Sequence, residues 1–282
     1  MTHMSTHYSV RYAVHPNDFV SYDTQKLRKE FLIESLFESG TIQLVYTHYD
    51  RYIVGGAMPS SEALTLEAID PLKADIFLER REMGIINVGE TGIVRVGDTE
   101  YELGYKEALY LGRGEQNISF HQKDGKQPLF YINSAPAHHA YPTQKVTQDE
   151  AEIVELGSLE TSNRRTIRKL IVNSVVQTCQ LQMGMTTLDT GSVWNTMPAH
   201  VHDRRMEAYF YFELPEDQTL CHFLGQTHET RHIWMQNNQA VLSPPWSIHS
   251  GSGTSNYTFI WGMAGENLDY SDMDGCAPNQ LR

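Results

Sequence analysis

Cysteines are few in this chain of 282 residues, and basic residues are fewer than acidic ones. The three cysteines, Cys179, Cys221 and Cys276, lie far apart and form no CxxC pair, which argues against a disulfide framework and a cysteine-rich zinc site. The 22 basic side chains are outnumbered by 35 acidic ones, so the formal net charge is −13. Because such a chain repels phosphate groups, we expect no nucleic acid and no anionic membrane among its partners.

Long apolar runs are also missing. No window approaches about 18 uninterrupted apolar residues, so the sequence predicts no membrane span. The first ten residues, MTHMSTHYSV, lack the charged start and apolar core of a signal peptide, and we therefore expect a cytoplasmic protein. A hydrophobic fraction of 40% over this length is typical of one large or two moderate globular domains.

Short alternating runs between glycines and prolines dominate the sequence. Residues 92–98 are expected to form a strand that ends in a turn, with residues 99–103 as its partner. Further strand-like runs cover residues 108–111, 240–243 and 257–261. Helical periodicity is restricted to residues 24–37 and, ambiguously, to residues 163–175, which contain several β-branched side chains. The pattern predicts an all-β protein of the barrel or sandwich type.

Similar motifs recur in the two halves of the chain. An acid-Arg-Arg triplet occurs at residues 79–81 and again at residues 203–205, and it is followed by ALYLGRGEQN at 108–117 and by AVLSPPWSIH at 240–249. We interpret the recurrence as a duplicated module with one loop insertion. A polar connector with two prolines, residues 134–161, separates the copies. The expected domains are residues 1–150 and residues 151–282.

The segment NTMPAHVHDRRMEAYFYF, residues 195–212, holds a candidate metal site. Side chains repeat every second residue along a strand, so His200 and His202 are expected on one face. A turn after them lets Glu207, on the next strand, point at the same place, and His249 follows a second, proline-containing turn. Three imidazoles and one carboxylate suit Zn²⁺, and also Mn²⁺, Fe²⁺, Co²⁺ or Ni²⁺.

The alternative to a metal site is a pair of surface histidines, His200 and His202, with Glu207 as an ordinary charged residue at the end of a strand. The N-terminal copy of the module argues against this alternative, because none of the four candidate ligands recurs there. Aligning the two copies places these residues at the four positions: Ile76, Leu78, Met83 and Asn117. A metal site lost from one copy would vanish as a set in this way, whereas random polar decoration would not.

The spacing HxHx₄E, followed far downstream by Pro-x₄-His, is typical of the cupin superfamily of small β-barrels. Leu214 and Trp246 stand where cupins often have glycine, which affects the loop geometry rather than the ligands. A closer resemblance extends from about residue 23 to the C-terminus. The segments that resemble the 5-dehydro-4-deoxy-D-glucuronate isomerase family are FLERREMGIINVG, SAPAHHAYPT, TSNRRTI, TCQLQMG, WNTMPAHVHDRRMEAYFYF, QTHETRHI, SPPWSIHSG and YTFIWGMAGEN.

This resemblance implies an all-β bicupin in which a C-terminal barrel binds metal and an N-terminal barrel does not. It also implies one Zn²⁺ per chain, a homo-oligomer that is possibly a hexamer, and a ketouronate as the small-molecule substrate in the breakdown of pectin-type uronates. The zinc ligands of the family match His200, His202, Glu207 and His249 of this sequence.

The implied reaction is an aldose–ketose isomerisation, in which the proton at C2 of the substrate must be moved. Glu207 is one candidate base, although a committed metal ligand makes a poor base. Tyr209 and Tyr211 share its expected face and are candidate proton donors, but strand aromatics are more often core residues. A hydride shift would need no base, and the sequence leaves these alternatives open.

The substrate carries a carboxylate, for which a bidentate arginine is the preferred partner. Arg204 and Arg205 follow the histidine pair directly, and Arg231 lies in a strand of the same expected barrel. Each of the three is also a candidate for an ordinary surface ion pair, and Arg164 and Arg165 are weaker candidates for the substrate. A further histidine pair, His138-His139, is expected to be structural, because adjacent residues of an extended chain point opposite ways.

Two other functions use the same residues. In a cupin dioxygenase the four ligands would hold Fe²⁺ and activate oxygen, which Zn²⁺ cannot do. A sugar-acid binding module without catalysis is the second alternative, and the complete ligand set disfavours it.

Overall fold

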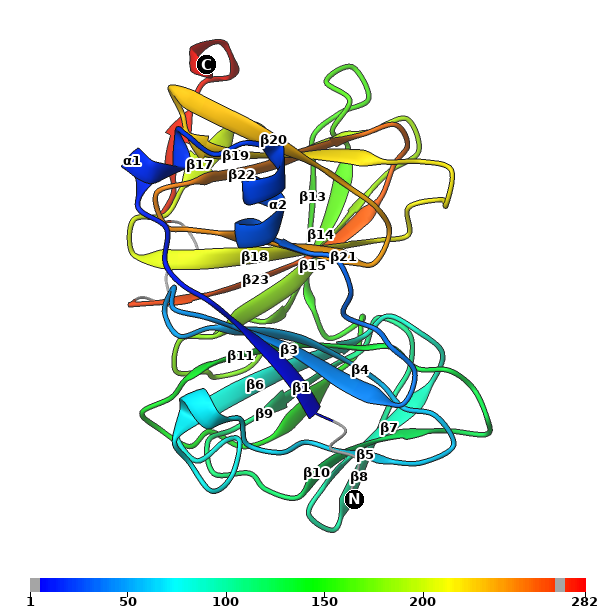
Figure 1. Cartoon of the computed structure of the whole chain (residues 1–282). Helices are drawn as coiled ribbons and strands as arrows, with labels where there is room; N and C mark the ends of the chain where they lie inside the picture. The colour runs from blue at the N-terminus through cyan, green and yellow to red at the C-terminus, as the bar shows by residue number, and fades with distance from the viewer. Residues whose placement is uncertain (1–5, 267–271) are drawn as a thin grey trace. The chain divides into compact units, whose positions relative to one another are not determined.

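Strands dominate the computed structural model, which describes residues 6–266 and 272–282 (Figure 1). The prediction of an all-β protein is confirmed. The helical elements of the described residues are α1 (Pro16–Phe19), α2 (Thr24–Phe31) and the 3-10 turns η1 (Asp70–Leu72) and η2 (Pro278–Gln280). Among these residues, no helix has both the length and the apolar character that crossing a membrane requires.

The chain folds into two compact units. Among the described residues, the first unit comprises residues 6–11, 35–152 and 170–183, and the second comprises residues 12–34, 153–169, 184–266 and 272–282. The predicted boundary at residue 150 lies close to the end of the long segment of the first unit. Neither unit is one continuous stretch, however, because short segments from each half of the chain belong with the other half.

The first unit contains one sheet of seven strands and one of four. In spatial order, the larger sheet consists of β1 (Thr6–Arg11), β3 (Thr41–Thr47), β4 (Ile53–Met58), β11 (Phe130–Pro136), β6 (Arg81–Asn87), β9 (Ala108–Leu111) and β12 (Gln144–Val146). The smaller sheet consists of β5 (Leu64–Thr65), β10 (Ile118–Gln122), β7 (Gly92–Val96) and β8 (Thr99–Leu103). The predicted hairpin is therefore confirmed as β7–β8.

A second pair of sheets has the same numbers of strands. The larger one consists of β13 (Glu152–Leu156), β14 (Arg165–Ile171), β15 (Gln182–Leu188), β23 (Thr258–Gly265), β18 (Arg205–Phe212), β21 (Gln239–Ser243) and β2 (Leu32–Ile33). The smaller one consists of β16 (Trp194–Asn195), β22 (Ile248–Gly253), β19 (Leu220–Gln226) and β20 (Glu229–Met235). Two short strands, β17 (Ala199–Val201) and β24 (Asp274–Cys276), pair with each other.

The two pairs of sheets repeat the same strand order, which supports the duplicated module. In the larger sheets β6 corresponds to β18, with β11 and β9 as neighbours in one case and β23 and β21 in the other. In the smaller sheets β10 corresponds to β22, and the hairpin β7–β8 corresponds to β19–β20. These correspondences allow the two copies to be compared residue by residue.

The segment before β6 matches the segment before β18. The backbone N–H of Arg81 donates to the carbonyl of Leu78 at 3.4 Å, and that of Arg205 donates to the carbonyl of His202 at 3.3 Å. Leu78 is thus the counterpart of His202, as the sequence alignment predicts. The same offset makes Met83 the counterpart of Glu207.

The predicted counterpart of His249 is wrong. His249 pairs with Leu224, and Leu224 holds the same place in its hairpin as Val94 does in β7–β8. Val94 pairs with Phe120, so Phe120 and not Asn117 corresponds to His249. The alignment without gaps failed because the loop before β10 is longer than the loop before β22.

Hydrophobic packing replaces the candidate site in the first unit. Leu78, Met83 and Phe120 each have 0% of their surface exposed and belong to one buried core cluster of that unit. Burying side chains of this size contributes about 1.5–3 kcal/mol each. The residues that take the places of the candidate ligands therefore stabilise the first unit instead of binding an ion.

Both helix predictions need correction. The helix α2 begins at Thr24, where the Asp23 carboxylate accepts the Lys26 N–H at 2.8 Å, but it ends at Phe31 rather than at residue 37. Leu32 turns to an extended conformation and pairs with Val241 as part of β2. Residues 163–175 contain no helix but the strand β14, because β-branched side chains fit a pleated sheet better than a helix.

A buried carboxylate fixes one segment of the first unit. Glu82, which has no exposed surface, accepts the backbone N–H groups of Cys179, Gln180 and Leu181, each at 2.8 Å. The hydroxyl of Tyr110 donates a fourth hydrogen bond at 2.7 Å. Four donors satisfy the ion, so burial of its charge is compensated.

We expect the Glu82→Gln protein to lose about 2–3 kcal/mol of unfolding free energy. The side-chain NH₂ group of glutamine would replace one carboxylate oxygen, and its two N–H donors would face groups that donate hydrogen bonds in the wild-type protein. Urea denaturation measures the change. Glu100→Gln, which alters an exposed carboxylate beside Arg95 in the same unit, serves as the control and should have a much smaller effect. Equal stability of the two variants would contradict the role of Glu82.

Candidate functional site

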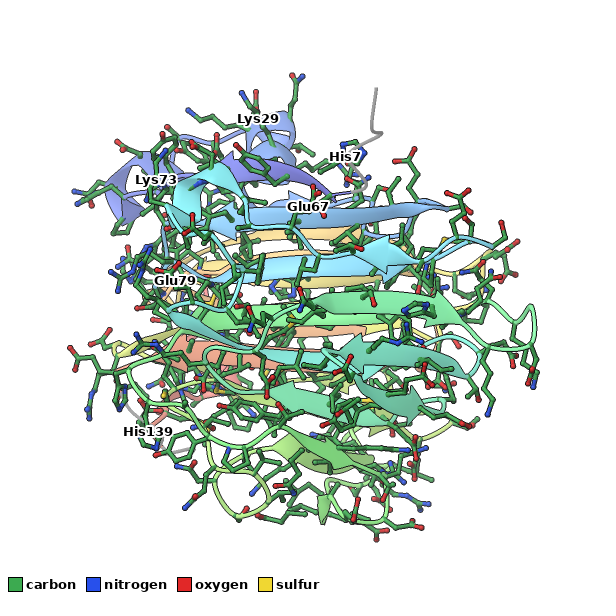
Figure 2. The ribbon with its side chains drawn as sticks, turned by 90° about the horizontal axis from the view of Figure 1, so that it is seen from below. His7, Lys29, Glu67, Lys73, Glu79 and His139 are labelled. Atoms are coloured by element: carbon green, nitrogen blue, oxygen red, sulfur yellow. The ribbon has the colours of Figure 1, made fainter. Side chains whose placement is uncertain are left out.

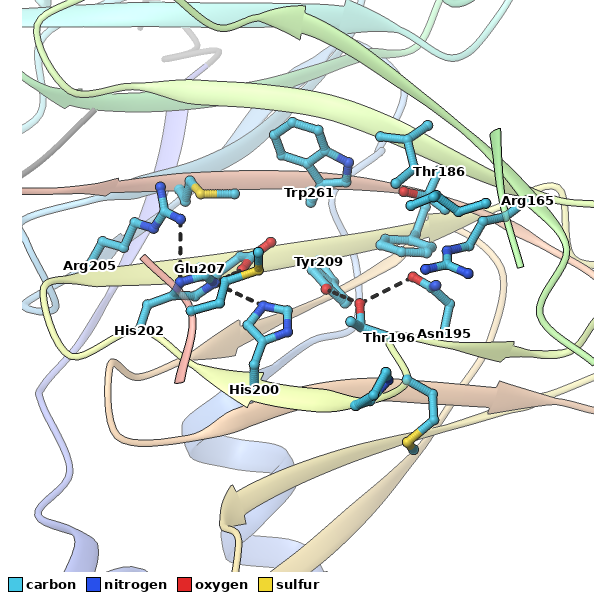
Figure 3. Close-up of a pocket in the computed structure, with 17 residues that line it drawn as sticks. Arg165, Thr186, Asn195, Thr196, His200, His202, Arg205, Glu207, Tyr209 and Trp261 are labelled. Atoms are coloured by element: carbon cyan, nitrogen blue, oxygen red, sulfur yellow. Dashed lines mark hydrogen bonds and ion pairs between the residues drawn. The ribbon is translucent and has the colours of Figure 1, made fainter. Parts of the chain in front are cut away.

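Three strands bring the candidate ligands together in the second unit. His200 lies in β17 and His202 directly follows it, so both imidazoles face the same side. A two-residue turn leads into β18, which carries Glu207, and His249 lies in β22. Figure 3 shows the imidazoles of His200 and His202 beside the carboxylate of Glu207.

The four ligand atoms converge. The Nε2 atom of His200 lies 3.1 Å from Nε2 of His202 and 3.0 Å from Nε2 of His249. The Oε2 atom of Glu207 lies 3.2 Å from Nε2 of His202 and 2.9 Å from Nε2 of His249. Neighbouring ligands bound at about 2.0–2.1 Å from one ion are roughly 2.8–3.4 Å apart in octahedral or tetrahedral shells. The four residues therefore fit one divalent ion, and all four ligand atoms lie within 4.8 Å of one another.

Burial and the neighbouring side chains together shift the pKa values of Glu207 and His200. Glu207 is 4% exposed, and its burial acts to raise the pKa of the carboxyl. The attraction of His249 and the hydrogen bonds from His202 and His249 outweigh burial, so the pKa of Glu207 lies well below its usual value. Burial, followed by the neighbouring His249, lowers the pKa of His200 to about 3. An ionised carboxylate and a neutral imidazole are the forms that bind a divalent metal.

A second carboxylate orients one of the imidazoles. The Nδ1 atom of His202 lies 3.1 Å from the backbone carbonyl of Asp272 and 3.3 Å from Nη2 of Arg205. The shorter contact, to the carbonyl, is made by the tautomer with an N–H at Nδ1, which leaves the Nε2 lone pair toward the cluster. The Asp272 carboxylate lies 2.6 Å from Nη2 of Arg205 and 3.4 Å from Nδ1 of His202. Such partners behind a ligand fix its tautomer and raise its basicity.

We expect Asp272→Asn to lower the metal affinity of the folded protein by about 10- to 100-fold, because Arg205 and His202 lose the charge that holds them. Competition with a fluorescent zinc chelator measures the affinity without reference to turnover. Asp274→Asn, an exposed change two residues along the same segment, should leave the affinity as in the wild type. If Asp272→Asn also retains wild-type affinity, the orienting role is wrong.

A cavity of about 230 Å³ opens beside the cluster. Both polar and apolar side chains line it, and the polar lining residues include Arg165, Thr186, Asn195, Thr196 and Tyr209. The Tyr209 hydroxyl lies 2.9 Å from Oγ1 of Thr196. In Figure 3 the imidazoles and Arg165 lie at opposite ends of this group, with Tyr209 and Thr196 between them.

The two tyrosines predicted beside Glu207 differ in their surroundings. Tyr209 lines the cavity, whereas Tyr211 does not and has no exposed surface. The Tyr211 hydroxyl lies 2.8 Å from Nδ1 of His222, and burial raises its pKa well above the usual value. The backbone of Gly251 passes so close that a Cβ there would lie 2.9 Å from this hydroxyl. The geometry favours Tyr209 as the residue that meets a ligand and Tyr211 as a packing residue.

The predicted arginines also separate. Arg205 lines the cavity and is 1% exposed, but its guanidinium already contacts Asp272. Neither Arg204 nor Arg231 is among the lining residues. Arg204 is exposed and lies 3.5 Å from Glu266, and Arg231 lies 2.6 Å from Glu229.

Arg165, a weaker candidate from the sequence, is the arginine that lines the far end of the cavity from the cluster. It begins β14 and lines the cavity, whereas its neighbour Arg164 pairs with Asp189 at 2.5 Å outside it. No local motif signals this difference, because it depends on where β14 lies in the sheet. The pair His138-His139 belongs to the first unit, where the backbone N–H of His139 donates to Sγ of Cys179 and the Cys179 thiol donates to the carbonyl of His139, each at 3.3 Å.

Comparisons with known proteins find relatives along nearly the whole chain. A sequence model of the KduI/IolB family matches residues 31–275. The chain is 64% identical over 280 residues to the 4-deoxy-L-threo-5-hexosulose-uronate ketol-isomerase of Formosa agariphila, covering 99% of this chain and 100% of the relative. It is 62% identical over 272 residues to ketol-isomerase 1 of the same name from Bacteroides thetaiotaomicron, covering 96% and 97%.

A solved structure with the same fold is the crystal structure of an IolB-like protein from Salmonella typhimurium LT2. It superimposes with a TM-score of 0.70 at 16% identity, covering 87% of this chain and 96% of the other. At this identity the likeness concerns the fold, and it agrees with the expected bicupin.

Proposed function

The chain belongs to the KduI/IolB family, and from this premise we propose that it catalyses the ketol-isomerisation of 4-deoxy-L-threo-5-hexosulose uronate. The product would be 3-deoxy-D-glycero-2,5-hexodiulosonate, in the breakdown of pectin-type uronates. The observation that carries the proposal is the convergence of His200, His202, Glu207 and His249 beside a cavity, in a chain 64% identical to a ketol-isomerase along its full length.

The four converging side chains would hold a divalent ion, for which we propose Zn²⁺. When bound, the ion supplies positive charge that stabilises the anion developing on the substrate's C1 and C2 oxygens. Three neutral nitrogen donors and one carboxylate suit Zn²⁺ and also other divalent metals. Apolar side chains, among them Phe259, Trp261 and Met263, line part of the cavity beside them.

In this isomerisation the C1 aldehyde and the C2 hydroxyl become a C1 hydroxyl and a C2 ketone. One hydrogen moves from carbon C2 to carbon C1, and the hydroxyl proton moves from the oxygen on C2 to the oxygen on C1. Tyr209 and Thr196 lie 2.9 Å apart in the cavity wall, and we assign them the transfer of this hydroxyl proton. Glu207 is held between His202 and His249, which makes it a poor base for the carbon-bound hydrogen.

The carboxylate of the substrate needs a cation. Arg165 supplies a guanidinium to the cavity, and Asn195 and Thr186 add polar groups near it. A planar guanidinium binds a carboxylate through two parallel hydrogen bonds and so fixes the substrate's direction. The reacting end of the sugar acid would then point toward the histidine cluster.

The proposal is tested by incubating the metal-loaded protein with 4-deoxy-L-threo-5-hexosulose uronate and following the mixture by NMR. The substrate signals should be replaced by those of an isomer of the same mass, without uptake of oxygen. Oxygen consumption would support the alternative dioxygenase, and unchanged substrate would support a binding module, so either result contradicts the isomerase.

We also propose that the protein is located in the cytoplasm and assembles into a homo-oligomer, with a hexamer as the expected form.

A further inference from the structure

A buried arginine that occurs in both copies of the module has different hydrogen-bond and charge partners in each copy. Arg205 and its counterpart Arg81 each begin a central strand and are 1% and 5% exposed. The guanidinium of Arg205 is neutralised by Asp272 at 2.6 Å. Arg81 instead donates to neutral oxygens: the Ser134 hydroxyl at 3.1 Å, the Ser134 carbonyl at 2.8 Å and the Arg51 carbonyl at 2.7 Å.

Within residues 6–266 and 272–282, no carboxylate forms an ion pair with Arg81. The charge of the adjacent Glu82 acts to raise the pKa of Arg81, but its carboxylate accepts its four hydrogen bonds from three backbone N–H groups and Tyr110 and none from Arg81. Burial lowers the pKa of Arg81 to about 10, and the like charge of Arg51 acts in the same direction. A buried cation without a compensating anion is costly.

A cavity of about 210 Å³ lies at this point of the first unit. Three arginines contribute to its wall, Arg51, Arg80 and Arg81. Tyr46, Leu72 and Phe77 contribute apolar surface. Guanidinium groups beside an apolar wall suit a ligand that has an anionic group and a small organic body.

The acidic residues around the cavity leave an excess of positive charge. Glu79 pairs with Arg80, and Asp70 pairs with Lys73 at 2.5 Å. Figure 2 shows Lys73 and Glu79 among the surface side chains of this segment. Arg51 and Arg81 are both lining residues, and the described residues that line the cavity include no carboxylate.

We propose that this cavity of the first unit binds a small organic oxyanion, a carboxylate or a phosphate, between Arg51 and Arg81. The oxyanion takes the place that the carboxylate of Asp272 holds beside Arg205 in the other copy of the module. The first unit thus lost a metal site but kept its arginine, and with it a separate anion site. This site does not depend on the proposed isomerase activity.

The test is isothermal titration calorimetry of the intact protein with two probes, D-galacturonate and inorganic phosphate. Arg51→Asn is the central variant, because asparagine tolerates the left-handed backbone of this position (φ 51°) and the buried Arg81 is left in place. Arg81→Lys is the second variant, which keeps the charge but loses the two-pronged geometry. Arg95→Asn is the control, because Arg95 is exposed and pairs with Glu100 elsewhere in the unit.

We expect one probe to bind the wild-type protein and Arg95→Asn equally, and to bind both other variants at least about tenfold more weakly. Galacturonate binding identifies a carboxylate site, and phosphate binding identifies a phosphate site. If neither probe binds the wild-type protein, or if Arg51→Asn and Arg81→Lys bind as the wild type does, the proposal is wrong.

Discussion

Replacing His249 with alanine is expected to abolish stoichiometric metal binding and to lower isomerase turnover by at least about 100-fold. His249 contacts both His200 and Glu207 at about 3 Å. Its loss therefore removes one of the four ligands. Elemental analysis of the purified protein and a turnover assay measure the two effects. Circular dichroism checks that the variant remains folded.

His232→Ala is the matched control for this change. His232 lies on β20, in the same small sheet as His249, but it is exposed and is not a member of the four-residue cluster. Its replacement should leave the metal content and the turnover unchanged. Normal metal content in His249→Ala would overturn the ligand assignment, whereas loss of both properties in His232→Ala would show that the sheet itself had been disturbed.

Replacing Arg165 with methionine should lower kcat/KM for the uronate substrate by at least about 30-fold. Methionine keeps much of the side-chain length but cannot pair with a carboxylate, and truncating one partner of a buried charge pair costs about 2–5 kcal/mol. Most of the effect should be in KM, because the carboxylate is bound in both the ground state and the transition state. Metal content should not change.

Arg164→Met separates this role from a general loss of positive charge. Arg164 precedes Arg165 directly, but it pairs with Asp189 and does not line the cavity. Its replacement should leave kcat/KM close to the wild-type value. Unchanged kinetics in Arg165→Met would exclude this residue as the carboxylate partner and would favour Arg205 in that role.

Local sequence patterns predicted much of the fold. The hairpin at residues 92–103 was readable because alternating side chains flank a two-residue turn, and the short run at 108–111 is β9 as expected. The helix that begins at Thr24 was overextended, because Leu32 and Ile33 are drawn into β2 by pairing with residues far along the chain. Such pairing leaves no local signal.

The candidate site was predictable where it depends on spacing within one segment. His200, His202 and Glu207 lie within eight residues, and strand alternation together with the turn at residues 203–204 brings them together. The role of Asp272 could not be inferred, because it depends on the pairing of β24 with β17. The counterpart of His249 was misplaced for a related reason, since loop lengths differ between the copies.

The need for one metal ion per chain is tested most directly by stripping the protein with a chelator and adding Zn²⁺ back in steps. Turnover of 4-deoxy-L-threo-5-hexosulose uronate is followed together with the amount of metal bound. Turnover should be lost in the stripped protein and should return in proportion to the metal, reaching its plateau at one ion per chain. Full turnover in the stripped protein, or turnover that no divalent metal restores, would contradict a catalytic ion held by His200, His202, Glu207 and His249.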